Sequence, residues 1–375
     1  MEFRKTLYSA VMGKTTAQRK TTLRRGWTTG ACATAATKAA YAALLTGEFP
    51  DPVAITLPRG ETPAFALAFE GLEDGVARAG IVKDAGDDPD VTHGATVIAQ
   101  VRRGAAGSGV VFRAGAGVGT VTKPGLPIEP GEPAINPVPR AMMRQVVAEL
   151  AARHGDAGDV EIEISVPGGE ELAQRTWNPR LGILGGLSIL GTTGIVRPFS
   201  CAAWIASIQR GIDVARATGL THVAGATGAT SEKAVAALYG LEISALIDMG
   251  DFAGGMLKYL RRHPVARVTV AGGFGKLTKL AQGALDLHSG RSEVDFAYLA
   301  EVARRALGNE ALAGRAATAN SALEVLRLAG KARQALADAV AQDALETGRG
   351  VLRGADVGLD IVVVDRDGEV IGRAG

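Results

Sequence analysis

The chain has 375 residues, of which 47% are hydrophobic and 5% aromatic, and its formal net charge is +2. At about 100 to 200 residues per domain, this length predicts two domains, and the composition is typical of a soluble globular protein. No apolar run approaches the roughly 20 residues that span a bilayer, so insertion into a membrane is not expected.

The charge is unevenly distributed along the chain. Residues 1–25 hold seven Lys and Arg against Glu2 alone, so this segment carries +6 and the remainder −4. The segment lacks the interleaved aromatics of a nucleic-acid surface and the apolar core of a signal peptide. We therefore expect a flexible arm that binds neither nucleic acid nor membrane. Cys32 and Cys201 form no CxxC pair, which predicts free thiols in a reducing cytoplasm.

Residues 26–157 are predicted to form an α+β domain with an antiparallel sheet. The Ala-rich sequence over residues 28–45 favours a helix, and a second helix is expected over residues 140–153. A break rich in Gly and Asp, residues 155–159, predicts the domain boundary. Short segments of strand character, separated by turn residues, are residues 53–57, 64–69, 76–81, 96–102 and 110–114.

Residues 158–375 are predicted to form a Rossmann-like α/β domain with a mainly parallel sheet. A strand over residues 160–166 and a helix over residues 199–218 precede three strand-loop-helix units. Such alternation predicts parallel strands, with a ligand site at their carboxyl ends. The expected strands of these units are residues 221–224, 243–247 and 267–271, followed by helices over residues 294–345 and a hairpin over residues 359–373.

An acidic loop, residues 83–94, lies in the first half of the chain and also contains Lys83 and His93. Its carboxylates would repel one another unless a metal, a cationic group or water separates them. The spacing lacks the pattern of a calcium loop, and the five histidines show no zinc spacing, so no metal site is predicted. A solvated surface loop is the alternative interpretation. The four aspartates are Asp84, Asp87, Asp88 and Asp90.

Glycine-bearing loops follow each strand of the three units. A glycine between a strand and a helix lets backbone amides face a ligand, although none of these loops is a GxGxxG fingerprint. Asp248 lies at the end of a strand and could accept hydrogen bonds from a ribose. Another Gly-rich run, residues 178–198, is costly in backbone entropy unless something approaches closely. Ordinary turns and a buried bulged strand are the alternative interpretations.

Several segments together resemble one family, the CbiD-type cobalt-precorrin-5B methyltransferases of the oxygen-independent route to cobalamin. The matching segments run in order from residue 26 to about residue 289. The basic arm and the tail after about residue 290 show little resemblance. The segments are GWTTGACA from residue 26, KDAGDDPDVT from 83, VTKPGL from 121, GEPAINPVPR from 131, NPRLGI from 178, SILGTTGIVRP from 188 and GKLTKLA from 275.

The resemblance implies transfer of a methyl group from S-adenosylmethionine to ring carbon 1 of a corrinoid, giving cobalt-precorrin-6A. Cobalt is then part of the substrate only. The corrinoid carries many carboxylates, so cationic side chains and amide donors in the matching segments are expected to hold it. These substrate-binding candidates are Thr28, Thr29, Gly30, Lys83, Lys123, Arg140, Arg180 and Lys276.

The resemblance supplies no established catalytic residue, so roles are assigned as hypotheses. The catalytic candidates are Asp84, Asp87 and His93. Asp84 or Asp87 would stabilise the sulfonium or remove a ring proton, and His93 is also a candidate cobalt ligand. An NADPH-dependent corrinoid reductase, a non-catalytic corrinoid carrier and a homo-oligomer are further possibilities. The residues expected to bind the methyl donor are Gly191, Thr192, Thr193, Gly194, Gly225, Thr227, Gly228 and Asp248.

Overall fold

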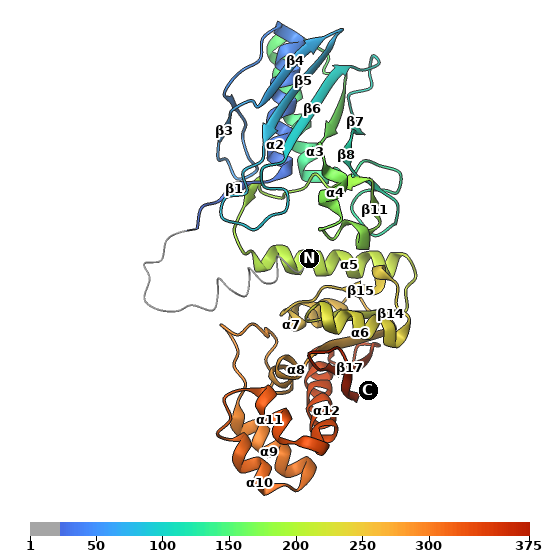
Figure 1. Cartoon of the computed structure of the whole chain (residues 1–375). Helices are drawn as coiled ribbons and strands as arrows, with labels where there is room; N and C mark the ends of the chain where they lie inside the picture. Colours follow the sequence, from blue (N-terminus) through green and yellow to red (C-terminus); the bar gives the residue numbers. More distant parts are fainter. Residues whose placement is uncertain (1–22) are drawn as a thin grey trace. The chain divides into compact units, whose positions relative to one another are not determined.

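The structure is a computed structural model that describes residues 23–375 (Figure 1). The chain divides into two compact units, of which the first ends at Ser200 and the second begins at Cys201. This boundary lies later than the predicted one after residue 157, because β10 (Val160–Ser165) is an inner strand of the first unit's sheet. Only the last three residues of the predicted basic arm belong to the described part of the chain.

The first unit is built on β10 and four other strands: β4 (Phe69–Glu73), β5 (Val76–Val82), β6 (Thr96–Arg103) and β7 (Val110–Ala114). They form one sheet in the order β4-β5-β6-β10-β7. Neighbours are antiparallel except β10 and β7, which are parallel, so the predicted antiparallel sheet is confirmed except at this edge. Ala77 and Ala79 of β5 are buried, whereas Arg78 between them pairs with Gln100 on the opposite face.

The two predicted helices of the first unit are present as α2 (Thr29–Thr46) and α3 (Pro137–His154). α2 is buried over most of its length because its alanines allow close packing against β5, β6 and α3. Thr28 caps the first turn of α2 with its side-chain oxygen. Cys32 on this helix and Cys201 are both free thiols, as predicted.

Pairs of two-residue strands complete the first unit. The predicted strands over residues 53–57 and 64–69 shorten to one such pair, β2 (Val53–Ala54) and β3 (Ala64–Phe65). The Gly-rich run over residues 178–198 supplies one strand to each of the other pairs. These are β1 (Gly26–Trp27) with β13 (Ile195–Val196), β8 (Gly117–Val118) with β12 (Gly186–Leu187), and β9 (Thr120–Val121) with β11 (Ile183–Leu184).

In two of these short strands, nearby backbone segments explain why the residue is glycine. A Cβ on Gly186 would lie 2.3 Å from the carbonyl carbon and oxygen of Gly117. A Cβ on Gly117 would lie 1.9 Å from the carbonyl oxygen of Val166. At these two positions, therefore, it is another backbone segment that approaches the glycine closely.

The second unit is built on β14 (His222–Ala226), β15 (Leu246–Ile247), β16 (Arg267–Gly273), β17 (Gly358–Val364) and β18 (Val370–Ala374). They form one sheet in the order β15-β14-β16-β17-β18. The first four are parallel and β18 is antiparallel to β17, which confirms the predicted mainly parallel sheet and closing hairpin. β15 is shorter than the strand predicted over residues 243–247, because a 3-10 turn, η2 (Ile243–Ala245), precedes it.

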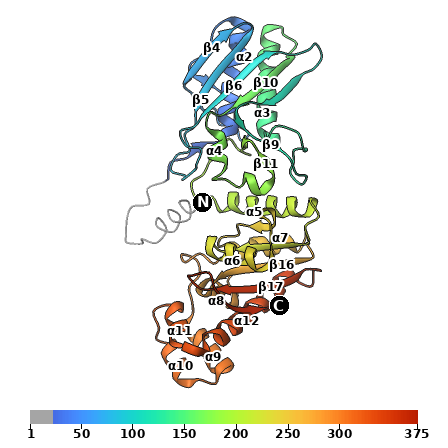
Figure 2. The ribbon, with the colours of Figure 1, turned by 45° about the vertical axis from the view of Figure 1, so that its right-hand side comes forward.

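Helices lie on both faces of this second sheet (Figure 2). α6 (Ala229–Tyr239) packs against Ala224 on one face, and Met256 of α7 (Ala253–Leu260) lies against Gly225 on the other. No helix within residues 23–375 is long and apolar enough to cross a membrane. The remaining α-helices of this unit are α5 (Cys201–Ala217), α8 (Phe274–Ala281), α9 (Phe296–Leu307), α10 (Glu310–Ala316), α11 (Ala322–Leu328) and α12 (Arg333–Leu352).

Candidate active site

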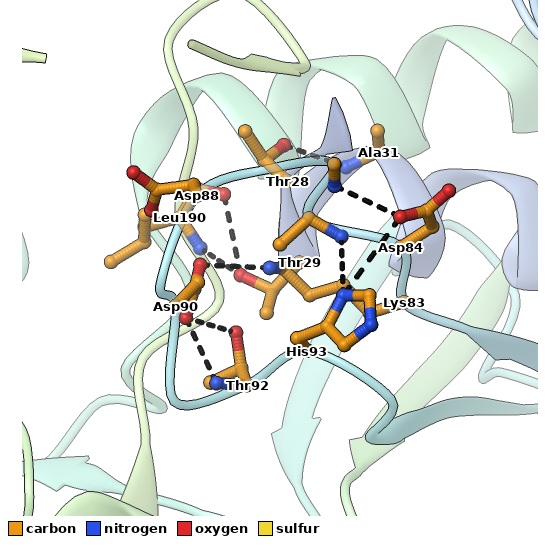
Figure 3. Close-up of polar contacts among 12 residues, drawn as sticks. Thr28, Thr29, Ala31, Lys83, Asp84, Asp88, Asp90, Thr92, His93 and Leu190 are labelled. Atoms are coloured by element: carbon orange, nitrogen blue, oxygen red, sulfur yellow. Dashed lines mark hydrogen bonds and ion pairs between the residues drawn. The ribbon is translucent and has the colours of Figure 1, made fainter. Parts of the chain in front are cut away.

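Three segments that are far apart in the sequence meet in the first unit: residues 24–30, 83–94 and 188–199 (Figure 3). We call them the acidic-loop cluster. Trp27 N donates to the carbonyl oxygen of Asp84 at 2.7 Å, and Gly30 N donates to that of Leu190 at 3.0 Å. The structure therefore brings together the start of α2, the acidic loop and the loop that contains Gly191 to Gly194.

Asp84 pairs with the guanidinium of Arg24, at the end of the predicted arm. One contact joins Arg24 Nη2 to Asp84 Oδ1 at 3.0 Å, a second joins Nη1 to Oδ2, and Gly86 N also donates to Oδ1 at 2.9 Å. The hydrogen bond from Arg24, followed by that from Gly86, lowers the pKa of Asp84 to about 2. Asp84 is thus a permanently ionised carboxylate near neutral pH, which makes it a weak general base.

Asp87 and Asp88 each accept a hydrogen bond from a backbone amide. Oδ2 of Asp87 accepts from Arg24 N at 2.6 Å, and Asp87 N donates to the carbonyl oxygen of Arg24 at 3.0 Å. Oδ1 of Asp88 accepts from Phe199 N at 2.9 Å. These contacts fasten the acidic loop to the segment that precedes β1 and to the segment that precedes α5.

Asp90 forms a buried ion pair with Lys83. The ammonium of Lys83, which is 2% exposed, lies 2.8 Å from Asp90 Oδ2. Oδ1 of Asp90 accepts from Thr92 N at 2.9 Å and from Thr92 Oγ1 at 2.7 Å. Burial opposes ionisation, but Lys83 and Thr92 together hold the pKa of Asp90 below its usual range. Lys83 is therefore enclosed in the loop, and the prediction that it binds substrate receives no support from its position.

His93, a predicted catalytic residue, has an exposed side chain. Its side chain is 54% exposed, and Nδ1 lies 3.8 Å from Asp84 Oδ1. Nδ1 accepts a hydrogen bond from Ala85 N at 3.1 Å. We infer from this contact that a neutral ring carries its proton on Nε2. In this arrangement Nε2 is a hydrogen-bond donor, which does not suit a cobalt ligand.

Variants of Asp87 separate a structural role from a catalytic one. Asp87→Ala is expected to lower the free energy of unfolding by about 1 kcal/mol, because Arg24 N loses its acceptor. Asp87→Asn keeps an acceptor oxygen without the charge, so its stability should stay close to that of the wild type. We expect both variants to turn over substrate within a few-fold of the wild type. A loss of about 100-fold or more in folded Asp87→Asn would instead identify Asp87 as the general base.

Three predicted substrate-binding residues have structural partners at the start of α2. The side chain of Thr28 accepts from Ala31 N, and Oγ1 of Thr29 accepts from Leu190 N at 3.0 Å. A Cβ on Gly30 would lie 2.6 Å from Pro139 Cγ. Thr28 and Thr29 are also buried, so their hydroxyls hold the helix start in place.

The predicted cationic residues of the first unit are mostly engaged with the chain itself. Nε of Arg140 donates to the carbonyl oxygen of Ile135 at 2.8 Å, and Nη2 donates to that of Pro133 at 3.0 Å. Arg180 is 9% exposed. The stem of Lys123 lies against Gly182, on which a Cβ would approach Lys123 Cγ to 2.5 Å. The structure thus gives Arg140 a positioning role for the segment that leads into α3.

The predicted cofactor loop in the first unit is packed against protein. A Cβ on Gly191 would lie 2.3 Å from Thr28 Oγ1, and one on Gly194 would lie 2.5 Å from Leu57 Cδ2. Both glycines have positive φ values, of 135° and 78°. Thr192 is exposed, whereas Oγ1 of Thr193 contacts the backbone of Ile195 at 3.3 Å. Neighbouring side chains and backbone conformation therefore account for both glycines without a ligand.

The other predicted cofactor residues lie in the second unit, where the strand order reverses. Numbered along the unit, the strands have the order 2-1-3-4-5, so the chain turns in opposite directions from β14 and β16. In open α/β sheets ligands bind outside the carboxyl ends of the strands at such a switch point. Gly228 and Gly273 are the N-caps of α6 and α8 at these two strand ends. A Cβ on either would meet no atom within 4 Å, and neither φ is positive.

The switch point is held together by contacts among the strand ends. Thr227 N donates to the carbonyl oxygen of Ala271 at 2.9 Å, and Gly250 N donates to that of Ala226 at 3.1 Å. Asp248 is 1% exposed, and its carbonyl oxygen accepts from Trp204 Nε1 at 2.9 Å. These bonds bring the loops after β14, β15 and β16 together at one edge of the sheet.

Gly225 does not belong to this edge, contrary to its prediction as a loop residue. It lies inside β14, where a Cβ would be 2.3 Å from Met256 Sδ. Close packing of α7 on the sheet therefore explains this glycine.

Lys276 also lies at this edge, on the first turn of α8. Its ammonium contacts Asp251 Oδ1 at 2.5 Å and the carbonyl oxygen of Leu287 at 3.0 Å. Nζ of Lys279 donates to the same carbonyl oxygen at 3.2 Å. Burial, followed by the charge of Lys276, lowers the pKa of Lys279.

Arg24 in the acidic-loop cluster and Asp251 at the switch point are not among the predicted site residues. Arg24 lies in the predicted flexible arm, although an acidic loop without a metal needs a cation nearby. Asp251 was visible as the second aspartate of the Asp-Met-Gly-Asp loop after β15. No group of His, Cys, Asp and Glu among residues 23–375 is arranged to hold a metal ion.

Comparison with known proteins identifies the family. Its model, described as CbiD, matches residues 16–198, and a second model, described as CbiD, C-terminal domain, matches residues 286–375. This chain belongs to the CbiD family. The resemblance predicted from the ordered sequence motifs is thus confirmed, and the second CbiD model extends it to the tail, where the motifs gave little.

Two relatives are similar to this CbiD chain over almost their whole length. A protein of Paramagnetospirillum magneticum is 66% identical, over 94% of this chain and 98% of the relative. One of Brucella anthropi is 63% identical, over 95% of this chain and 97% of the relative. Both are named cobalt-precorrin-5B C(1)-methyltransferase.

A crystal structure of the cobalamin biosynthesis protein CbiD from Archaeoglobus fulgidus is 29% identical. The match covers 72% of this chain and 83% of that one, with a TM-score of 0.39. The family assignment rests on the sequence matches.

Proposed function

We propose that this CbiD chain is a methyltransferase that transfers a methyl group from S-adenosylmethionine to ring carbon 1 of cobalt-precorrin-5B. The observation that carries this proposal is the 66% identity to a relative of that name, over 94% of this chain and 98% of the relative. The product is cobalt-precorrin-6A, and the reaction belongs to cobalamin biosynthesis. Cobalt enters only as part of the corrinoid substrate.

Methyl transfer from a sulfonium requires alignment more than it requires acid or base groups. The bond from sulfur to the methyl carbon breaks with its electron pair left on sulfur, and the ring carbon supplies the pair for the new bond. A protein accelerates this step by holding the ring carbon, the methyl group and the sulfur in line. The exposed His93 and the ionised Asp84 remain candidates for contacts with the macrocycle in the acidic-loop cluster.

We assign the methyl donor to the switch point of the second unit, which we interpret as Rossmann-like. This assignment is supported by the 2-1-3-4-5 strand order and by Gly228 and Gly273, which neither packing nor φ explains. A glycine without a Cβ at a helix start lets a ligand approach the backbone amides. Thr227 and Asp248 lie at the same edge. Gly191 and Gly194 are the weaker candidates, because side chains of the first unit occupy the space beside them.

The proposal is tested by incubating the full chain with cobalt-precorrin-5B and S-adenosylmethionine. We expect S-adenosylhomocysteine to be released and the corrinoid to gain one methyl group, as measured by mass spectrometry. Consumption of NADPH without methyl transfer would identify a corrinoid reductase instead. Binding of the corrinoid with no release of S-adenosylhomocysteine would identify a carrier. The cytoplasmic location, the absence of nucleic-acid binding and a homo-oligomer stay predictions.

A further inference from the structure

An ion pair lies beside the switch point of the second unit and is open to solvent. Lys276 and Asp251 are joined at 2.5 Å, and their side chains are 34% and 22% exposed. An ammonium has three donors, of which Asp251 and the carbonyl oxygen of Leu287 use two. The contact uses Oδ1 of Asp251, so the pair can accept a further cation at its second oxygen and a further anion at the ammonium.

The pair is placed at this edge by the same elements that carry the open glycines. Lys276 is the third residue of α8, so it lies three residues after Gly273. Asp251 follows Gly250, whose N donates to the carbonyl oxygen of Ala226 at the end of β14. The loop that contains Leu287 is fixed in turn, because Leu287 N donates to the carbonyl oxygen of Asp251 at 2.8 Å.

We propose that Lys276 and Asp251 bind the amino-acid end of the methyl donor. The methionine part of S-adenosylmethionine carries an α-carboxylate and an α-ammonium, and an ion pair with both partners within reach of solvent is complementary to such a zwitterion. Lys276 binds the carboxylate and Asp251 binds the ammonium. The inference rests on the proposed methyl transfer and reassigns Lys276 from the corrinoid to the donor.

Lys279 contacts the same loop as Lys276. It is 7% exposed and donates to the same carbonyl oxygen of Leu287 as Lys276 does. Two ammonium groups therefore converge on one carbonyl oxygen. Asp251, Glu293 and Asp286 all act electrostatically on Lys279, so the ammonium that an incoming carboxylate would meet is that of Lys276.

Two ligands that differ only in the amino-acid end provide the test. S-adenosylhomocysteine has the zwitterion, whereas 5′-methylthioadenosine retains the adenosine and the thioether without it. Binding of both is measured by calorimetry to the full chain, as wild type, Lys276→Met, Asp251→Asn and Lys258→Met. Lys258 is an exposed lysine of α7 and serves as the matched control.

We expect Lys276→Met and Asp251→Asn each to weaken the binding of S-adenosylhomocysteine by about 10- to 100-fold, the range expected for the loss of a charge-assisted hydrogen bond. Their affinity for 5′-methylthioadenosine should stay within about three-fold of the wild type, as should both affinities of Lys258→Met. Unchanged binding of S-adenosylhomocysteine in the two variants would overturn the inference, and so would an equal loss for both ligands. A wild type that binds neither ligand would instead overturn the proposed methyl transfer.

Discussion

Replacing Gly86 with alanine is expected to lower the free energy of unfolding of the first unit by more than about 4 kcal/mol, an exceptional loss for one residue. Gly86 has a φ of 66°, and a Cβ there would lie 2.2 Å from the carbonyl oxygen of Arg24. That oxygen belongs to backbone, which cannot move aside without breaking the bonds between Arg24 and Asp87. The acidic loop would therefore separate from the segment that precedes β1.

Gly94 offers a matched control at the other end of the same loop. Its φ of 79° is also left-handed, but a Cβ there would meet no atom within 4 Å. Gly94→Ala should therefore lower the free energy of unfolding by only about 1 kcal/mol, the cost of holding an alanine at a positive φ. Urea unfolding followed by hydrogen exchange of residues 76–103 reports on the first unit alone. Equal losses in the two variants would mean that φ, and not the contact with Arg24, requires Gly86.

The elements of the fold were predictable because their signals are local. The Ala-rich run of α2 and the alternating residues of β5, β6 and β10 indicate their structures within a few residues. The domain boundary was not predictable in this way. β10 joins its sheet through pairing with β6 and β7, and nothing in its own sequence distinguishes it from a first strand of the following unit.

The partners that Arg24 and Phe199 provide to the acidic loop were beyond prediction because these residues are distant from it in the sequence. Arg24 lies 60 residues from Asp84, and Phe199 lies 111 residues from Asp88. The sequence indicates that the four carboxylates need separation. In the structure Asp84 and Asp87 contact Arg24, whereas Asp88 contacts Phe199 and Asp90 contacts Lys83. The loop is therefore not simply a solvated surface turn.

Glycines illustrate the same limit at the candidate sites. Gly191 and Gly228 look alike in the sequence, because each is adjacent to a threonine in a short Gly-rich segment. Gly191 is required by Thr28, which is adjacent only in the folded chain, whereas space is open beside Gly228. The sequence thus predicts that a backbone is approached, but only the fold distinguishes a neighbouring side chain from room for a ligand.

Replacing Lys83 with methionine is expected to cost about 3 to 5 kcal/mol, because it leaves the carboxylate of Asp90 in a largely buried place without its cation. The double variant Lys83→Met/Asp90→Asn should recover much of the lost stability. An asparagine carries no charge, and its Oδ1 can still accept from Thr92 N and Thr92 Oγ1. Lys258→Met, on the exposed face of α7, should change stability by less than about 0.5 kcal/mol.

Acid pH gives an independent check on the role of Lys83. In the wild type the pKa of Asp90 lies below its ordinary value of 3.8, so its contribution is present above that pH and is lost as the pH falls. Without Lys83, burial raises the pKa, and protonation then relieves the unpaired charge. The stability difference between the wild type and Lys83→Met should therefore shrink when the pH is lowered from 7 to 4. A difference that stays constant with pH, or no recovery in the double variant, would show that Lys83 stabilises the loop by packing and not by its charge.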